Sequence, residues 1–202
     1  MNNRLKIRLL LTIALLWPSA VFSLSASNEV LCRAVCDKDT VAVTSNGRLL
    51  LIRPGGRTKT LTRRLPIRDI AGMTCYKGEL LLLSRQGVIL STADYKSFTA
   101  FDFNSTYTGY YGYVRFTAIS ASDRAVFIAG TYDDGQPAVF ESAVITVWSE
   151  RELSYTKEGQ TLMLKSQPTD LQYDAPHDRF IMTCSDGTLF YMPNCSHCNS
   201  AQ

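Results

Sequence analysis

An internal repeat constrains this chain more than any other feature. A polar turn, an apolar strand, a turn containing glycine and a second apolar strand recur four times, at residues 36–52, 75–90, 123–140 and 178–191. The repeats begin about 40 to 55 residues apart, which is the length of a propeller blade of four strands. Because a single unit cannot cover its own apolar strands, neighbouring units must stack.

The strand pattern within the repeats indicates an all-β fold. The run 80–83 is continuously apolar, which is typical of a strand covered on both faces, and no long stretch keeps a helical period. A sandwich hairpin at 123–140 is the alternative, but four matching units favour a propeller. We predict a small β-propeller of about four blades, each a four-stranded antiparallel sheet. The domain spans 27–202, with repeat units at 29–66, 67–112, 113–163 and 164–202.

The first residues predict export. Arg4, Lys6 and Arg8 precede the short apolar run 9–17, and small residues follow at 19–26. This order is that of a secretory signal peptide at 1–26, with an uncleaved anchor as the alternative. We expect a secreted, periplasmic or extracellular protein with no membrane span after cleavage.

Charge argues against a nucleic-acid partner. The whole chain carries a formal net charge of +3, and the three basic residues of the leader account for that excess. The mature protein is therefore close to neutral, and its basic residues are scattered. We expect the cluster at Arg63, Arg64 and Arg68 to be an ordinary solvated loop.

A second motif follows the two middle hairpins. Thr92, Asp94 and Phe98 fit the pattern Ser/Thr-x-Asp-x-x-x-aromatic, and Ser142 and Trp148 repeat its ends at the same spacing without the acid. This resembles the Asp-box, or BNR, hairpin of sialidase-type and photosystem-assembly-factor-type β-propellers. The resemblance implies that the hydroxyl and Asp94 bind turn backbone and that Phe98 and Trp148 pack between strands. It implies a fold rather than an activity.

Two classes of function remain open at this stage. Active sialidases resemble this family but carry a central arginine triad with a Tyr–Glu pair and an Asp, and no motif in this chain places such residues on one axis. We therefore assign no catalytic residue and expect no cofactor. The first hypothesis is a non-catalytic binding or scaffold module, and the alternative is an extracellular glycosidase. An empty or apolar central axis would argue against the alternative.

Tyrosines supply the candidate binding residues. Tyr107, Tyr110, Tyr111 and Tyr113 lie with two glycines between the second and third units. A tyrosine offers a large face with a polar tip, which suits a sugar or a protein partner. The alternative is a loop between blades whose tyrosines pack across the rim. We expect a protein or glycan ligand and leave the oligomeric state open.

Six cysteines in an exported chain predict disulfides, although the pairing cannot be read from the sequence. They are Cys32, Cys36, Cys75, Cys184, Cys195 and Cys198. A closed propeller brings its ends together, so we expect the pair 32/36 to be linked to the pair 195/198 as a staple. Alternatives are a zinc site built from Cys32, Cys36, Cys195 and Cys198, and a role for Cys36 and Cys75 as small core residues.

Overall fold

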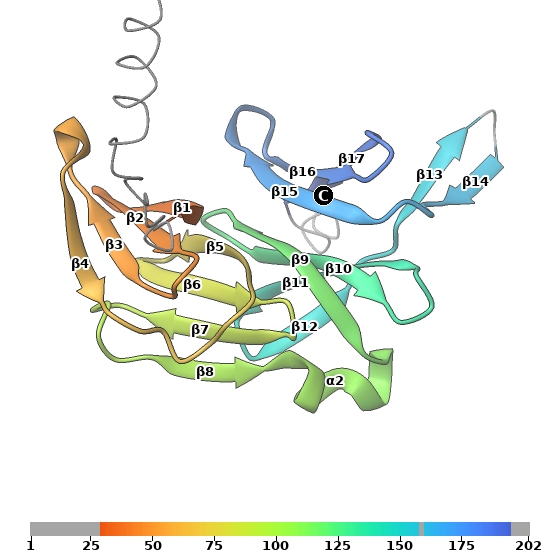
Figure 1. Ribbon diagram of the computed structural model, residues 1–202. Helices are drawn as coiled ribbons and strands as arrows, with labels where there is room; N and C mark the ends of the chain where they lie inside the picture. The colour runs from red at the N-terminus through yellow and green to blue at the C-terminus, as the bar shows by residue number, and fades with distance from the viewer. Residues whose placement is uncertain (1–28, 158–159, 195–202) are drawn as a thin grey trace, which may run out of the picture.

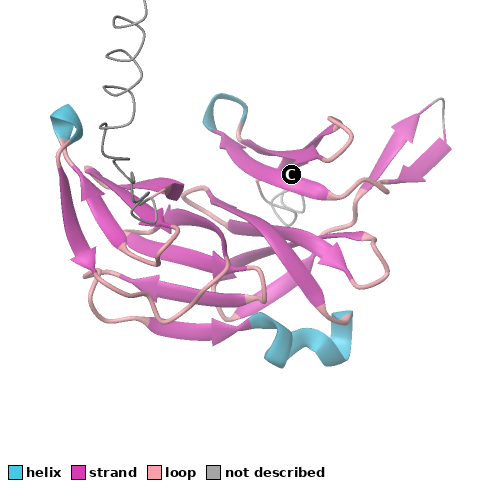
Figure 2. Ribbon diagram, viewed as in Figure 1, coloured by secondary structure: helices cyan, strands magenta, loops and turns pink. Residues whose placement is uncertain are grey.

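The protein is built mainly of strands, as a computed structural model of residues 29–157 and 160–194 shows (Figures 1 and 2). The predicted signal peptide, residues 1–26, lies outside the described residues. Among the helices that are described, none has the length and the apolar character needed to cross a membrane.

The first two sheets each have four antiparallel strands paired in chain order. The first sheet consists of β1 (Val30–Cys36), β2 (Asp39–Thr44), β3 (Leu49–Ile52) and β4 (Thr58–Thr62), with the short helix η1 (Pro54–Gly56) between the last two. The second sheet consists of β5 (Ile70–Tyr76), β6 (Glu79–Ser84), β7 (Val88–Thr92) and β8 (Thr99–Asp102). Short turns join successive strands, and such hairpins produce antiparallel pairing.

The second half of the chain is less regular. After the helix α2 (Phe103–Tyr111), the third sheet consists of β9 (Val114–Ala121), β10 (Val126–Tyr132), β11 (Pro137–Val144) and β12 (Val147–Glu150). A two-stranded ribbon follows, made of β13 (Ser154–Lys157) and β14 (Gln160–Met163). The fourth sheet consists of β15 (Pro168–Asp174), β16 (Arg179–Cys184) and β17 (Leu189–Pro193), with η2 (Ala175–His177) after its first strand.

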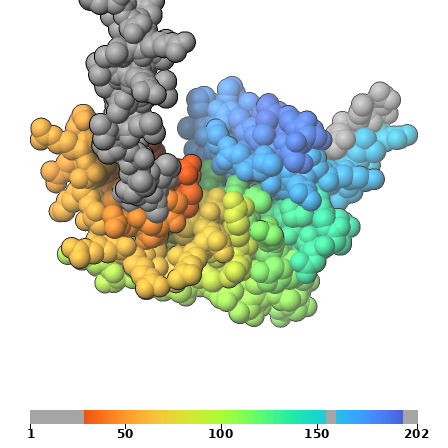
Figure 3. All heavy atoms as spheres, viewed as in Figure 1, coloured from red at the N-terminus to blue at the C-terminus, as the bar shows by residue number. Residues whose placement is uncertain are grey.

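The four sheets form a β-propeller, which confirms the predicted fold. They follow one another around the molecule in chain order, from orange to blue (Figure 3). The first strand of each sheet, β1, β5, β9 and β15, lines one central cavity of about 860 Å³. One detail differs from the prediction, because the fourth sheet has three strands, rather than four, among the described residues.

Strand β6 explains the continuous apolar run in the sequence. Leu80, Leu81, Leu82 and Leu83 are all 0% exposed. Successive side chains of a strand point to opposite faces, and these four alternate between two cores. Leu80 and Leu82 pack towards the first sheet, whereas Leu81 and Leu83 pack towards the third. The strand has no solvent face, so it needs no polar residue.

Three hydrophobic cores hold the array together. The core between sheets one and two is mainly aliphatic and includes Val41, Val43 and Leu90. The core between sheets two and three is rich in aromatic rings, with Phe103 and Phe140 at its centre. The third core joins sheets three and four. In the described part of the chain, no comparable cluster joins sheet four to sheet one.

Candidate functional site

Two adjoining cavities on the third sheet form the candidate site. They have volumes of about 700 Å³ and 490 Å³ and share Tyr132, Asp134, Gln136 and Glu150 as lining residues. The larger extends under the β13–β14 ribbon, and the smaller extends towards the C-terminal end of α2. We call this continuous depression the acidic tyrosine groove.

The turn between β10 and β11 builds the floor of the groove. The Asp134 carboxylate accepts a hydrogen bond from the Gln136 amide at 3.0 Å, and the Tyr132 amide donates to the Gln136 carbonyl at 2.9 Å. Gly135 has φ +86°, a conformation that side chains disfavour, so glycine allows the tight turn. These contacts fix Asp134 where the two cavities meet.

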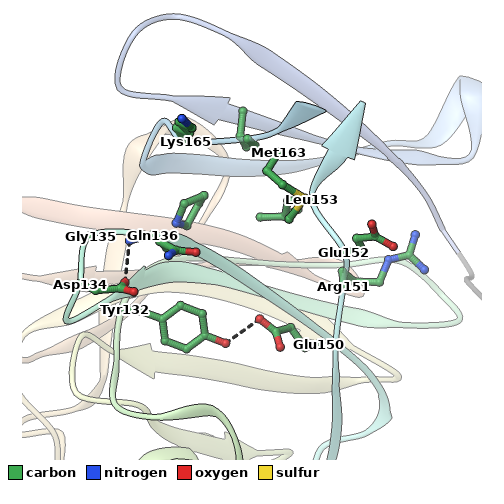
Figure 4. A pocket seen from close by; sticks show the side chains of 12 residues that line it. Tyr132, Asp134, Gly135, Gln136, Glu150, Arg151, Glu152, Leu153, Met163 and Lys165 are labelled. Carbon is green, nitrogen blue, oxygen red and sulfur yellow. Dashed lines mark hydrogen bonds between the residues drawn. The ribbon is translucent and has the colours of Figure 1, made fainter. Parts of the chain in front are cut away.

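Tyr132 and Glu150 form the central polar contact of the groove. The Tyr132 hydroxyl donates to Glu150 Oε1 at 2.6 Å (Figure 4). Burial raises the pKa of Tyr132, and the hydrogen bond to the Glu150 carboxylate raises that pKa further. The phenol therefore stays neutral at physiological pH and keeps the carboxylate oriented.

The groove has an excess of negative charge. Its exposed carboxylates are those of Asp133, Asp134, Glu150 and Glu152. Lys165 lines the same cavity on the side away from Asp134 and Glu150 (Figure 4). Arg151 also lines the larger cavity, but its guanidinium pairs with the largely buried Glu141 carboxylate at 3.2 Å. The lining thus has one exposed lysine and four exposed carboxylates.

The structure divides the predicted tyrosine cluster into two pairs. Tyr110 is 83% exposed and Tyr113 is 41% exposed, and both line the smaller cavity. Tyr107 instead accepts a hydrogen bond from the Trp148 amide at 3.0 Å, and its ring packs at a tilt against that of Phe103, with centroids 5.0 Å apart. Tyr111 packs against Phe140 with ring centroids 5.1 Å apart, although it also borders the smaller cavity. Tyr110 and Tyr113 are therefore free to meet a ligand.

This cluster lies mostly on the helix α2, whereas a loop between blades was the alternative to a binding site and no helix was predicted. Asp102 caps α2 by accepting a hydrogen bond from the Ser105 amide at 3.0 Å, and Gly112 ends it with φ +85°. Phe103, which is fully buried, anchors the first turn of the helix. The Asp-x-x-Ser sequence before an aromatic run was the available signal, because Asp is a preferred helix cap.

Thr92, Asp94 and Phe98 lie at the turn after β7. Thr92 Oγ1 accepts a hydrogen bond from the Tyr95 amide at 2.9 Å, and Asp94 accepts from the Lys96 and Ser97 amides, each at 2.8 Å. These backbone hydrogen bonds lower the pKa of Asp94 to about 2. Phe98 packs partly buried against the core between sheets one and two.

Ser142 and Trp148 flank the equivalent turn of the third sheet. Ser142 Oγ donates to the Val147 carbonyl at 2.6 Å. Trp148 is buried, and its indole N–H donates to the Ile145 carbonyl at 2.6 Å. Both residues hold the turn without an acid.

One disulfide joins Cys36 of sheet one to Cys75 of sheet two. The expectation of disulfides is thus confirmed for this pair, and the assignment of Cys36 to the end-to-end staple or to a zinc site is wrong, because its sulfur is already bonded. Burial raises the pKa of the Cys32 thiol to about 11, and Cys184 is buried in the third core. Cys195 and Cys198 lie outside the described residues.

Within the described ranges, no group of three or more His, Cys, Asp or Glu side chains could hold a metal ion. The described lining of the central cavity carries few charged residues. Its charged lining residues among those described are Arg33 and Asp170, and most of the rest are small, apolar or hydroxyl side chains. A single arginine on the axis does not supply an arginine triad.

No protein-family model matches the chain, and no curated protein sequence matches it. The fold does match solved structures. YCF48 from Cyanidioschyzon merolae is similar with a TM-score of 0.54 and 15% identity, over 77% of this chain and 48% of that chain. The extracellular domain of a hybrid two-component system from B. thetaiotaomicron is similar with a TM-score of 0.50 and 10% identity, over 78% and 19% respectively.

The computationally designed Ika4 protein matches with a TM-score of 0.47 and 13% identity, over 83% of this chain and 92% of that chain. The chain thus spans about half the length of YCF48 and a smaller share of the two-component protein. At such low identities, similarity in structure is evidence for a shared fold only. The likenesses to YCF48 and to the two-component protein are evidence for the β-propeller fold of this chain.

Proposed function

We propose that this protein is an exported, non-catalytic binding module that holds a basic segment of a partner protein in the acidic tyrosine groove. The observation that carries the proposal is the meeting of exposed tyrosine faces with four exposed carboxylates along one pair of adjoining cavities. The propeller supplies a rigid support, and the groove supplies the chemistry.

Cationic side chains fit this groove better than neutral sugars do. A lysine or arginine can lie over the Tyr110 or Tyr113 ring while its charged group reaches a carboxylate. The hydrogen bond from Tyr132 holds Glu150 in place, so less side-chain freedom is lost on binding. The charge excess therefore favours a protein ligand over a glycan, the other ligand class predicted from sequence.

Export is part of the same proposal. The leader at 1–26 and the Cys36–Cys75 disulfide both support a location outside the reducing cytosol. The Thr92–Asp94 turn supports an Asp-box type of blade, in which such turns are structural. None of these three features implies a catalytic activity.

The test compares ligand classes on one protein. We expect labelled peptides with alternating lysine and tyrosine to bind in fluorescence anisotropy, whereas matched glutamate peptides and neutral oligosaccharides do not. The double variant Tyr110→Ala/Tyr113→Ala should weaken peptide binding by about tenfold or more, as loss of aromatic anchors does. Tyr191→Ala is the matched control, because Tyr191 is also exposed but lies on the fourth sheet. Binding of glycans alone, or an equal loss in the control, would contradict the proposal.

A further inference from the structure

A second depression, on the first sheet, gathers arginines that are separated in sequence. It has a volume of about 560 Å³ and lies between the β2–β3 turn and the segment that joins β4 to β5. Four arginines line it, namely Arg48, Arg63, Arg64 and Arg68, and Asp69 is the one carboxylate in the lining. From the sequence, residues 63–68 were predicted to form an ordinary solvated loop, with no connection to Arg48.

The backbone that carries these arginines is held in place. Leu65 is buried in the core between sheets one and two, and its amide donates to the Gly47 carbonyl at 2.8 Å. The Arg48 amide donates to Thr44 Oγ1 at 3.1 Å, and Gly47 has φ +74°, which glycine accepts without strain. Arg63 and Arg64 therefore sit directly before an anchored residue, opposite a fixed turn.

The positive charge of this depression is not balanced within the described ranges. None of the four arginines forms an ion pair with a carboxylate there. The whole chain, in contrast, has 21 Lys and Arg residues against 18 Asp and Glu residues, so most of its charge is matched. Four guanidinium groups around one cavity repel one another, and a bound anion would relieve that repulsion.

We propose that this depression binds an oxyanion group, a phosphate or sulfate ester carried by a ligand. The planar guanidinium group donates two parallel hydrogen bonds that match the oxygens of phosphate, which lysine cannot do. Arg48 approaches from the turn, and Arg63, Arg64 and Arg68 approach from the facing segment. The site is separate from the acidic tyrosine groove on the third sheet and does not depend on that proposal.

Inorganic pyrophosphate is the probe for a soluble ligand that carries a phosphate group. We expect calorimetry at low salt to detect binding of pyrophosphate to the full mature chain. Arg63→Gln/Arg64→Gln should weaken that binding by about tenfold or more, since each charge-assisted hydrogen bond counts for about that factor. Arg53→Gln/Arg57→Gln is the matched control, because it removes the same charge from the exposed η1 turn of the same sheet. A loss of less than about twofold is expected in the control.

A second arm distinguishes a soluble ligand from a lipid headgroup. Sedimentation with phosphatidylglycerol–phosphatidylcholine vesicles is compared with sedimentation with vesicles of phosphatidylcholine alone. Arginine-dependent binding to anionic vesicles would assign the site to a lipid phosphate, whereas pyrophosphate binding without vesicle binding would assign it to a soluble ester. Failure of both probes, or equal weakening in the two double variants with both still folded by thermal melting, would overturn the oxyanion site.

Discussion

The inner and outer faces of the sheet array differ in how their apolar residues are covered. Between sheets two and three, Phe103 and Phe140 are fully buried with ring centroids 4.7 Å apart. On sheet one, Val35 borders the open central cavity and is 65% exposed, and on sheet four Tyr191 is 48% exposed. The same repeat thus produces covered and uncovered faces, depending on whether a neighbour follows.

Polar contacts also form where two sheets face each other. At the interface of sheets three and four, Asp178 accepts hydrogen bonds from Arg124, from Tyr173 at 2.8 Å and from Asn194 at 2.7 Å. Ser122 of the third sheet donates to Asn194 at 2.6 Å. The interface therefore combines a hydrophobic core with a polar network. Contacts between neighbouring sheets of this kind add to the stability that each sheet has by itself.

The largest expected effect is at the aromatic core. Phe140→Ala should lower the free energy of unfolding by about 4–5 kcal/mol, because it removes a ring that packs against Phe103, Phe116 and Tyr111 and leaves a cavity. Chemical denaturation measures the loss. Val35→Ala on the uncovered face is the control and should cost no more than about 0.5 kcal/mol. Equal losses would mean that the two faces do not differ as described.

The disulfide between sheets one and two should contribute somewhat less. It closes a loop with a sequence separation of 39 residues, for which chain entropy predicts a stabilisation of about 3–4 kcal/mol. Cys36→Ala/Cys75→Ala should therefore unfold at lower denaturant concentration than the oxidised wild type. Reductant should destabilise the wild type and leave the double variant unchanged. A double variant as stable as the oxidised protein would show that the core alone holds these sheets.

A smaller, pH-dependent effect is expected at the interface of sheets three and four. Hydrogen bonds from Arg124, then Asn194 and Tyr173, lower the pKa of Asp178 to about 2 from its usual value of 3.8. Because the folded-state pKa is depressed, the stabilisation is present above the unfolded pKa and is lost as pH falls through about 2.

Asp178→Asn keeps the side-chain shape in a left-handed backbone position that Asn tolerates. Its melting temperature should lie below that of the wild type at about pH 5, and the difference should shrink towards about pH 2. Asp170→Asn, which removes an exposed carboxylate from the same sheet, is the control for the change in charge alone. If the difference in melting temperature between Asp178→Asn and the wild type stayed constant with pH, the charge of Asp178 would not contribute to stability.

The repeat pattern predicted the strands because each hairpin is a local event. The run 80–83 implied a strand buried on both faces, and both neighbouring cores confirm it. The glycine turns marked the hairpins for the same reason. Helix α2 was missed, since its short cap signal at Asp102 competes with strong β-type residues around it.

The candidate site was only partly visible in the sequence. Tyr110 and Tyr113 were named, but their partners at 132–136 and 150–152 were not, because these segments meet only when the third sheet folds. Likewise, the arginines at 63–68 and Arg48 line one depression, because the Leu65 amide binds the Gly47 carbonyl of the β2–β3 turn.

The sequence by itself determined the all-β class, the repeat and the need for neighbouring units to stack, since these depend on the alternation of apolar residues and on turn residues along a few positions. Only the tertiary structure decided that Cys36 pairs with Cys75, which faces are covered and which charges gather. These features depend on distances between residues tens of positions apart, and a local pattern carries no information about such distances.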